Sequence, residues 1–439
     1  MSATHNQFSP NQGQSEAIDR ILRWSDPDTS ERFLSLSGPA GTGKTSILQV
    51  LADRWGRGVK WAAMTGRAAR RMREAAGLRG ATTLHRALYG RFDEVDNVKR
   101  QRIDLRFRDV RKEVDSILVV DEASMVDRRI LDDIRSSRYQ KVLLCGDGVQ
   151  IPPVSDDGKG DWSVFQEVTG PQLSEVMRTA GAIVEAGTIV RERQEILRGV
   201  LEHGGSRYEH TTDFRGAIRQ WFDDREDHVL VTWRNESRMR LTAQIRSVLG
   251  HASPYPEPGE PVVVRRNSYA HGIMNGDLYY VDDWLGDGPE IAGVKTRFLR
   301  LRETRYPLLP IASVEDIEPD DCAMAGRTPT LLVPLQGREA VFDGFLPYVG
   351  LTAWKSGLEA AGVDESSIIP VTFGYVLTGH LVQGSEYRRA TTLLFGDMSS
   401  RNFRKPTALP DGTKMSFAMR FIYTCVTRAK ERSTLVESG

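Results

Sequence analysis

Short apolar runs alternate with helical segments along the N-terminal part of the chain. Strand-like runs lie at residues 33–37, 59–65, 115–122 and 141–145. Segments with helical spacing of apolar residues begin near Asn11, Ser46 and Ala68. The run at 115–122 has the apolar centre that is typical of a parallel strand buried on both faces. This alternation predicts an α/β fold built around a parallel sheet.

The pattern changes in the second half of the chain. A strand at 228–233 and a helix from Asn235 precede a Pro-rich break at 254–261. Beyond the break, short strands predict a small β-barrel inserted in a second α/β module; they lie at 262–265, 278–282, 295–302 and 330–333. The α/β pattern resumes at residue 368. Three aromatic residues of the insert either line a strand-binding surface or pack in its core: Trp284, Tyr348 and Trp354.

Composition narrows the class of protein. The 439 residues exceed one ordinary core and suggest several modules. Lys plus Arg number 59, as do Asp plus Glu, so positive charge for a nucleic-acid partner must be concentrated in a local groove. The three cysteines are unclustered, which indicates a reducing compartment and no zinc site. The sequence shows no signal-peptide core and no membrane-length apolar run, so we expect a cytoplasmic protein with no membrane partner.

The strongest local signal is a phosphate loop. Residues 38–45 read GPAGTGKT, between a predicted strand and a predicted helix. Glycines allow the backbone N–H groups to surround phosphates, and the helix N-terminus adds favourable partial charge. Lys44 is predicted on the β- and γ-phosphates of ATP, and the Thr45 hydroxyl on Mg²⁺. An amide at Gln14, just before this loop, could pair with both groups of an adenine edge.

Polar residues follow two further predicted strands. Asp121 and Glu122 end one run, and burial of adjacent carboxylates is costly without a cation. We therefore predict Asp121 as a Mg²⁺ partner and Glu122 as the group that activates water. Gln150, after the next strand, is predicted to orient that water or to sense the γ-phosphate. Two remote arginines, Arg178 and Arg428, could reach the γ-phosphate as arginine fingers or be ordinary surface residues.

Several residues are candidate contacts to a nucleic-acid backbone. Thr65, Thr83 and His85 follow predicted strands, where small polar groups can hold a phosphodiester. For the arginines on the helix after Thr65, which include Arg70, Arg71 and Arg73, a solvated helix face is the favoured interpretation. Further candidates are Arg67, Asn235, Thr378 and His380. Phe107, in a charged segment at 89–113, could stack on a base or pack within that segment. Gly384 permits close approach of backbone to a ligand, and Glu386 could accept from a ribose hydroxyl.

In this order, the motifs resemble those of superfamily 1B DNA helicases of the RecD-like and Dda-like branch. They are Gln14 with Ala17, GPAGTGKT from Gly38, TGRAA from Thr65, TLH from Thr83, DEASM from Asp121, GDGVQIPPV from Gly146, LSEVMR from Leu173, VQGSE from Val382 and YTCVTRA from Tyr423. The chain departs from the family pattern at Leu381, where a Lys is usual, and at Thr242, where an Asn is common. The segment at 89–113 has no clear match in the family pattern, and Phe107 is the residue of that segment that we assign as the strand-separating pin.

The resemblance implies an architecture. It comprises two RecA-like phosphate-loop NTPase domains, with a small insert in the first and an SH3-like β-barrel insert in the second. The expected boundaries are residues 1–160 for motor domain 1A, with its insert at about 89–113, residues 161–250 and 366–439 for motor domain 2A, and residues 251–365 for the SH3-like insert 2B.

The resemblance also implies an activity: ATP-dependent translocation from 5′ to 3′ on single-stranded DNA, with unwinding of duplex. The implied nucleotide-binding residues are Gln14, Gly38, Pro39, Ala40, Gly41, Thr42, Gly43, Lys44, Thr45, Ser46, Gly384 and Glu386. The expected cofactors are ATP and Mg²⁺, and the expected partners are single-stranded DNA and duplex junctions, with a single-stranded-DNA-binding protein or replisome components as candidate protein partners. We expect a monomer in a bacterial or phage-infected cell.

Two other functions fit the same residues. One is a DNA-stimulated ATPase translocase that remodels nucleoprotein or anneals strands without efficient unwinding. The other is a nucleotide-gated DNA-binding module without catalysis, which the presence of Glu122 and Gln150 disfavours. RNA also remains open as the substrate, because contacts to the backbone read little besides the 2′-hydroxyl.

Overall fold

A computed structural model describes residues 8–56, 58–74, 77–78, 80–89, 117–153, 162–176, 181–224, 227–253, 255–265, 276–303, 330–335, 351–363, 368–395, 398 and 400–438. The chain divides into two compact units. Unit 1 comprises Met1–Gly90, Asp104–Trp233 and Gly379–Gly439, and unit 2 comprises Arg91–Ile103 and Arg234–Thr378. Three candidate residues named from the sequence, Phe107, Arg178 and Tyr348, lie outside the described residues.

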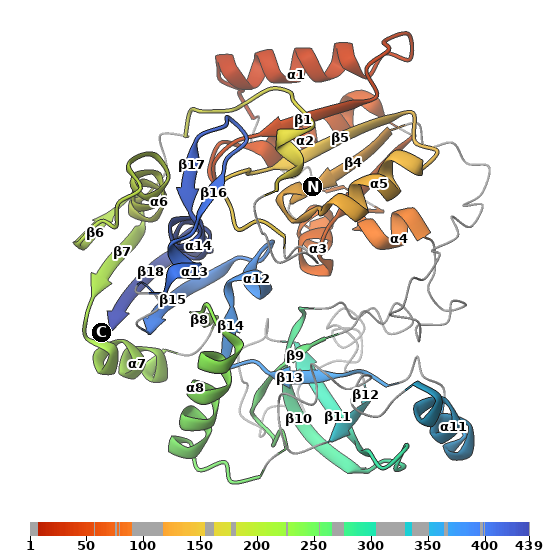
Figure 1. Ribbon diagram of the computed structural model, residues 1–439, viewed down its shortest axis with the longest axis vertical. Coiled ribbons are helices and arrows are strands. Elements are labelled where there is room, and N and C mark those ends of the chain that lie inside the picture. Colours follow the sequence, from red (N-terminus) through yellow and green to blue (C-terminus); the bar gives the residue numbers. More distant parts are fainter. Residues whose placement is uncertain are drawn as a thin grey trace, which may run out of the picture. The chain divides into compact units, whose positions relative to one another are not determined.

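Unit 1 contains a five-stranded parallel sheet with the order β1-β5-β4-β2-β3. Figure 1 labels β1, β5 and β4 of this sheet. Its strands are β1 (Phe33–Ser37), β2 (Val59–Ala63), β3 (Thr82–Thr83), β4 (Ile117–Asp121) and β5 (Lys141–Gly146). Every residue of β4 and β5 is buried, as expected for central strands of a parallel sheet covered on both faces. Because all five strands are parallel, their carboxyl ends meet at one edge of the sheet, where the predicted motifs follow them.

Five helices accompany this sheet in the described residues, and α1, α2 and α3 begin within two residues of the predicted starts near Asn11, Ser46 and Ala68. They are α1 (Gln12–Trp24), α2 (Lys44–Trp55), α3 (Gly66–Glu74), α4 (Leu84–Tyr89) and α5 (Arg128–Ser136), with short 3₁₀ turns η2 (Ala123–Met125) and η3 (Val164–Gln166). Asn11 caps α1 in a reciprocal capping box with Gln14. Fully buried apolar side chains of α1, β1 and α2, such as Ile21, Leu34 and Ile47, belong to one hydrophobic core.

A second sheet of unit 1 contains the strands β8-β15-β18-β7-β6 in that order. Their bounds are β6 (Gly199–His203), β7 (Ser206–Thr211), β8 (His228–Thr232), β15 (Tyr387–Phe395) and β18 (Ala429–Ser438). β6 pairs antiparallel with β7, and the other pairs are parallel. The accompanying elements are α6 (Ala182–Arg193), α7 (Phe214–Asp223), α12 (Gly379–Val382), α13 (Arg401–Arg404) and α14 (Phe417–Val426), with the hairpin β16 (Pro406–Ala408) and β17 (Lys414–Ser416).

Unit 2 contains an antiparallel sheet with the order β12-β11-β10-β9-β13. Its elements are α8 (Asn235–Val248), β9 (Pro261–Val264), β10 (Leu278–Asp287), β11 (Lys295–Glu303), β12 (Thr330–Leu335), α11 (Leu351–Ala361), β13 (Val371–Phe373) and β14 (Val376–Thr378). Trp354 is buried in a small core, whereas Trp284 is 49% exposed. Of the two interpretations given above, packing in the core therefore applies to Trp354 and does not apply to Trp284. Closure of this sheet into an SH3-like barrel stays a prediction, as do the domain boundaries.

Within the described ranges, every helix is too short or too polar to span a lipid bilayer.

Candidate active site

The phosphate loop connects β1 to the N-terminus of α2. Gly41 and Gly43 both have φ of +80°, a conformation that favours glycine. A Cβ on Gly43 would lie 2.5 Å from the Gln14 Nε2 atom, so a side chain there would displace the Gln14 amide. Lys44 Nζ donates to the carbonyls of Gly38 at 2.6 Å and Pro39 at 2.8 Å. The lysine is therefore folded back over its own loop, beside the positions where phosphates would bind.

Burial and three nearby carboxylates have opposite effects on the pKa of Lys44. Burial lowers the pKa of Lys44, and the carboxylates of Asp147, Glu122 and Asp121 oppose that shift. These three acids follow β4 and β5 at the same edge of the sheet. The site thus combines a cation with carboxylates, as a Mg-nucleotide site requires.

Gln14 is 1% exposed and contacts the phosphate loop directly. Its Nε2 donates to the Thr42 carbonyl at 3.0 Å, and its Oε1 accepts from the Asn11 backbone N–H at 2.9 Å. Beside it lies a pocket of about 240 Å³, lined by the start of α1 and by the segment from Gln172 to Glu175. The predicted contact between Gln14 and adenine stays a prediction. The observed role of Gln14 is to fix the phosphate loop against α1.

The two acids at the end of β4 are buried. Asp121 Oδ1 accepts from the Glu122 backbone N–H at 2.9 Å, while Asp121 Oδ2 is buried without a hydrogen-bond partner. Burial raises the pKa of Asp121, and Glu122 adds to that effect. Glu122 has a φ of 55°, which is strained for a residue with a side chain. Strain and an unsatisfied carboxylate oxygen are typical of a functional site.

Arg71 corrects one interpretation made from the sequence. Its NH2 group lies 3.3 Å from Glu122 Oε1 and 3.9 Å from Asp121 Oδ2, and its NH1 group lies 2.8 Å from Glu386 Oε1. The side chain is 24% exposed, so Arg71 does not belong to a solvated helix face. Burial lowers the pKa of its guanidinium, but the three carboxylates outweigh this effect and the pKa is raised. Arg71 supplies the cation that adjacent buried carboxylates need.

Gln150 lies in the loop after β5 and is 4% exposed. Its side-chain Oε1 is buried without a hydrogen-bond partner, which leaves an acceptor available for a ligand or water. The loop is held by Arg420 of α14, a residue that the sequence prediction missed. The Arg420 guanidinium donates to the carbonyls of Gly148, Val149 and Gln150 at 2.7–3.2 Å. A single arginine in the apolar stretch SFAMRFIY was the available signal.

A second buried network reaches the phosphate loop. Tyr423 donates to Asp147 Oδ2 and accepts from the Ala40 backbone N–H at 3.2 Å. Arg191 NH1 lies 2.7 Å from Asp147 Oδ1. Burial raises the pKa of the Asp147 carboxyl, but Arg191 and Lys44 outweigh it and the net pKa is lowered. None of Asp147, Arg191 and Tyr423 was predicted as a site residue, although Asp147 and Tyr423 stand within motifs quoted above.

The remaining predicted residues of the nucleotide site lie close to these groups. Arg428 is buried, and its Nε donates to the Thr424 carbonyl at 3.1 Å, so its role as an arginine finger stays a prediction. Glu386 pairs with Arg71 and, at 2.9 Å, with Lys430. Gly384 has a φ of +69°, and a Cβ there would lie 2.9 Å from Thr65 Oγ1. The segment from Gly384 to Glu386 therefore contacts the start and middle of α3.

Most of the predicted strand contacts also have structural partners. Thr65 Oγ1 caps α3 by accepting from the Ala68 N–H at 3.1 Å. Arg67 NH1 donates to the Tyr387 hydroxyl at 2.7 Å. Burial lowers the pKa of His85 and of His380, which favours neutral imidazoles. Thr83 is buried in β3. Two further candidates, Asn235 and Thr378, belong to unit 2. Their contacts to nucleic acid stay predictions.

The residues present fit a magnesium ion at the predicted position. Asp121 Oδ2 is a buried carboxylate oxygen with no hydrogen-bond partner, and Thr45 stands in the first turn of α2 next to Lys44. Hard oxygen ligands of this kind are what Mg²⁺ prefers.

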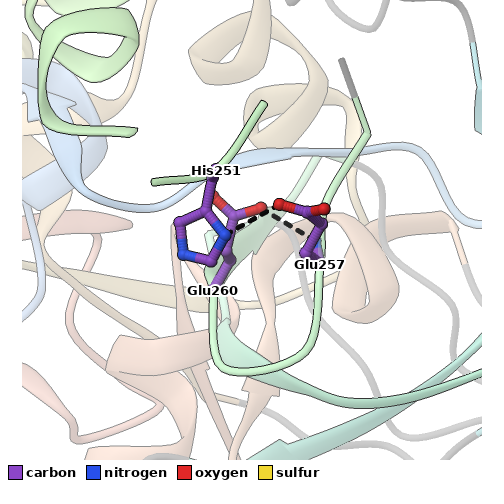
Figure 2. Close-up of side chains that lie close together, drawn as sticks. All are labelled: His251, Glu257 and Glu260. Carbon is purple, nitrogen blue, oxygen red and sulfur yellow. Dashed lines mark hydrogen bonds and ion pairs between the residues drawn. The ribbon is translucent and has the colours of Figure 1, made fainter. Parts of the chain in front are cut away.

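Figure 2 shows another group with metal-like spacing among the described residues, His251, Glu257 and Glu260 in unit 2. Glu260 is fully buried and accepts from Arg246 at 2.6 and 3.0 Å and from the Tyr375 hydroxyl at 3.0 Å. Its second oxygen also accepts from the Glu257 N–H at 2.8 Å. Because donors already occupy this carboxylate, the group is a structural ion-pair cluster rather than a metal site.

Sequence comparisons connect this site to known proteins. The AAA_30 family model, described as an AAA domain, matches residues 9–204. The ATP-dependent RecD2 DNA helicase of Deinococcus radiodurans is 27% identical over 290 residues, which cover 61% of this chain and 38% of that protein. An uncharacterized protein of Methanocaldococcus jannaschii is 30% identical over 174 residues, 36% of this chain and 14% of that protein. The chain thus matches less than half the length of these relatives.

Solved structures show the same fold. A structure described as two coordinating Pif1 helicases at forked double-stranded DNA covers 98% of this chain with a TM-score of 0.53 at 17% identity, and 92% of its own chain is matched. Pif1 helicase from Bacteroides in complex with ADP-AlF3 and single-stranded DNA gives 0.51, also at 17% identity, with the same two coverages of 98% and 92%. The α/β fold with a parallel sheet matches the RecA-like domains of these structures. Together, the comparisons show an AAA domain over residues 9–204 and an α/β fold like that of Pif1 helicases, in line with the resemblance stated from the motifs.

Proposed function

We propose that this chain is a superfamily 1B helicase of the RecD/Pif1-like type, which hydrolyses ATP to move 5′ to 3′ along single-stranded DNA and unwinds duplex. One observation carries the proposal: Asp121 Oδ2 and Gln150 Oε1 are buried acceptors without hydrogen-bond partners, at the end of β4 and in the loop after the adjacent strand β5 of the sheet that supplies the phosphate loop. Buried unsatisfied acceptors are costly, so a bound ligand is the simplest reason for them.

Each residue of the site has a role in this proposal. Thr45 and Asp121 hold Mg²⁺, which when bound neutralises charge on the phosphates and orients them. Lys44 leaves the carbonyls of Gly38 and Pro39 for the phosphate oxygens. Glu122 accepts a proton from the attacking water, and Gln150 orients that water.

The second sheet of unit 1 completes the proposed site. Tyr423 reaches the phosphate loop at Ala40, and Arg191 reaches Asp147, so movement of α14 or α6 alters the surroundings of a bound γ-phosphate. Arg178 and Arg428 are proposed to add positive charge to the transition state. If hydrolysis is coupled to these contacts, Thr65 and His85 would bind the DNA strand in one stage of the cycle, and Thr378 and His380 would bind it in the other.

DNA is the proposed substrate because the names of a similar protein and of similar structures include DNA. The Deinococcus relative is named an ATP-dependent DNA helicase, and the Pif1 structures are described with forked double-stranded DNA or single-stranded DNA. A monomer acting at duplex junctions in the cytoplasm of a bacterial or phage-infected cell stays part of the proposal.

Phosphate release with and without oligo(dT) tests the ATPase. The wild-type chain is expected to hydrolyse ATP faster with oligo(dT). Lys44→Ala and Glu122→Gln are expected to reduce the rate by a factor of about 100 or more, since each removes a group that acts on the transition state. Normal hydrolysis by Lys44→Ala would refute the assignment of the site.

A further inference from the structure

Arg71 lies between the proposed catalytic carboxylate and a segment of the second sheet of unit 1. Its NH2 group is 3.3 Å from Glu122 Oε1, and its NH1 group is 2.8 Å from Glu386 Oε1. Glu386 Oε2 also pairs with Lys430 at 2.9 Å. The guanidinium therefore hydrogen-bonds to two carboxylates, with the Asp121 carboxylate further away at 3.9 Å, and the shortest contact is the one to Glu386.

The helix that carries Arg71 begins at the proposed strand contacts. Thr65 caps α3, and Arg67 stands one turn before Arg71. Arg67 donates to the Tyr387 hydroxyl at 2.7 Å and lies 4.9 Å from the centre of that ring. Two arginines one helical turn apart thus contact two consecutive residues, Glu386 and Tyr387. A ligand that moves the start of α3 would move both contacts together.

We infer that Arg71 is a positioning residue that restrains Glu122 until DNA binds at the start of α3. The inference rests on the proposed function and assigns the means by which DNA would stimulate hydrolysis. The guanidinium occupies Glu122 Oε1 at 3.3 Å and holds this carboxylate toward α3, so Glu122 is not free to orient toward the attacking water and hydrolysis is slow. When DNA displaces the start of α3, Arg71 transfers fully to Glu386, and Glu122 is released to the attacking water.

The geometry favours this direction of transfer. The contact to Glu122 is the longer of the two, so it is the weaker one to break. Glu122 has one side-chain hydrogen bond among the described contacts, the one with Arg71, whereas Glu386 keeps Lys430 as a second partner. Mg²⁺ at Asp121 would also replace Arg71 as the cation beside these acids.

The test measures phosphate release with and without oligo(dT) in the wild type and in Arg71→Ala. Loss of the restraint is expected to raise the DNA-independent kcat by about threefold to tenfold, and to reduce the stimulation by oligo(dT) by a similar factor, with little change in KM. Arg71→Lys should be intermediate, since a lysine keeps the charge but cannot reach two carboxylates in the same way.

A second variant lowers the same ratio by another route, through the DNA-stimulated rate and not through the basal rate. In Glu386→Gln, Arg71 has no charged partner to move to, so Glu122 stays restrained and the DNA-stimulated rate falls while Arg71 is intact. A matched control is Arg207→Ala, because Arg207 also bridges two carboxylates, Glu202 at 2.9 Å and Glu209 at 3.2 Å, on β6 and β7. Its stimulation ratio should equal that of the wild type.

A readout without nucleotide or metal completes the test. Thermal unfolding midpoints of Arg71→Ala, Glu122→Gln and the double variant should be non-additive in the absence of oligo(dT) and additive in its presence. Equal loss of basal and stimulated hydrolysis in Arg71→Ala, or an unchanged stimulation ratio, would overturn the inference. Failure of the wild type to hydrolyse ATP would instead overturn the proposed function.

Discussion

Substitution of Arg420 by methionine tests how the loop that carries Gln150 is held. Arg420 is 1% exposed, and its guanidinium donates to three consecutive backbone carbonyls, those of Gly148, Val149 and Gln150, and to Thr407 Oγ1 at 3.2 Å. Methionine fills much of the same volume but donates no hydrogen bond. The Arg420→Met variant therefore leaves a row of buried carbonyls without this donor.

The magnitude follows from these contacts. A hydrogen bond from a charged donor contributes about 1.5–3 kcal/mol, and a buried acceptor left without its donor costs about 1–3 kcal/mol. Part of the loss is offset, since the variant no longer buries a guanidinium. We expect the free energy of unfolding to fall by about 3 kcal/mol in Arg420→Met, and kcat to fall as well because Gln150 is no longer held in place.

Urea unfolding followed by circular dichroism measures the first effect, and phosphate release below the unfolding temperature measures the second. The matched control is Arg240→Met, which removes an exposed pair with Glu236 on α8 and should change the stability by less than about 0.5 kcal/mol. An Arg420→Met variant as stable and as active as the wild type would show that Arg420 does not hold this loop.

Three further predictions address other parts of unit 1. Gln14→Ala removes the amide that donates to the Thr42 carbonyl and half of a capping box. The free energy of unfolding should fall by about 1 kcal/mol, seen as a slightly lower melting temperature, and the KM for ATP should rise. An unchanged KM would contradict this prediction. Gly384→Ala forces a side chain into a φ of +69° beside Thr65, so thermal unfolding should report a loss of about 1–2 kcal/mol, and equal melting points would refute the strain. Burial lowers the pKa of His228 to about 4 from 6.5, so the unfolded chain binds the proton first as the pH falls. Stability should then decrease by up to about 3 kcal/mol between about pH 6.5 and pH 4, a slope that His228→Gln should lack in urea titrations.

Much of the first sheet could be predicted from sequence because its strands are short apolar runs with polar ends. The run at 33–37 matches β1, and the Asn11 cap and the phosphate loop fall where their local signals place them. The run at 59–65 was expected to be longer than β2, which ends at Ala63 because α3 starts at Gly66. Local chemistry thus determines these elements with little help from tertiary contacts.

The long-range side-chain contacts that helices of unit 1 make around the site could not be predicted in this way. Arg71 has the same local sequence signature as Arg70, a charged residue on an Arg-rich helix, and only the fold brings it to Glu122 and Glu386. Arg191 and Arg420 likewise find partners more than 40 residues away in sequence, Asp147 and the carbonyls after β5. Long-range ion pairs leave no periodic pattern, so their residues resemble ordinary surface or helix residues until the fold is known.

Strand displacement with tailed duplexes tests the central claim most directly. Duplexes with a 5′ single-stranded tail or a 3′ tail are incubated with the chain, ATP and Mg²⁺, and the released strand is quantified. Displacement that requires ATP and a 5′ tail is the expected result for a 5′-to-3′ helicase. DNA-stimulated hydrolysis without displacement would favour a translocase, and displacement from the 3′ tail alone would contradict the proposed direction.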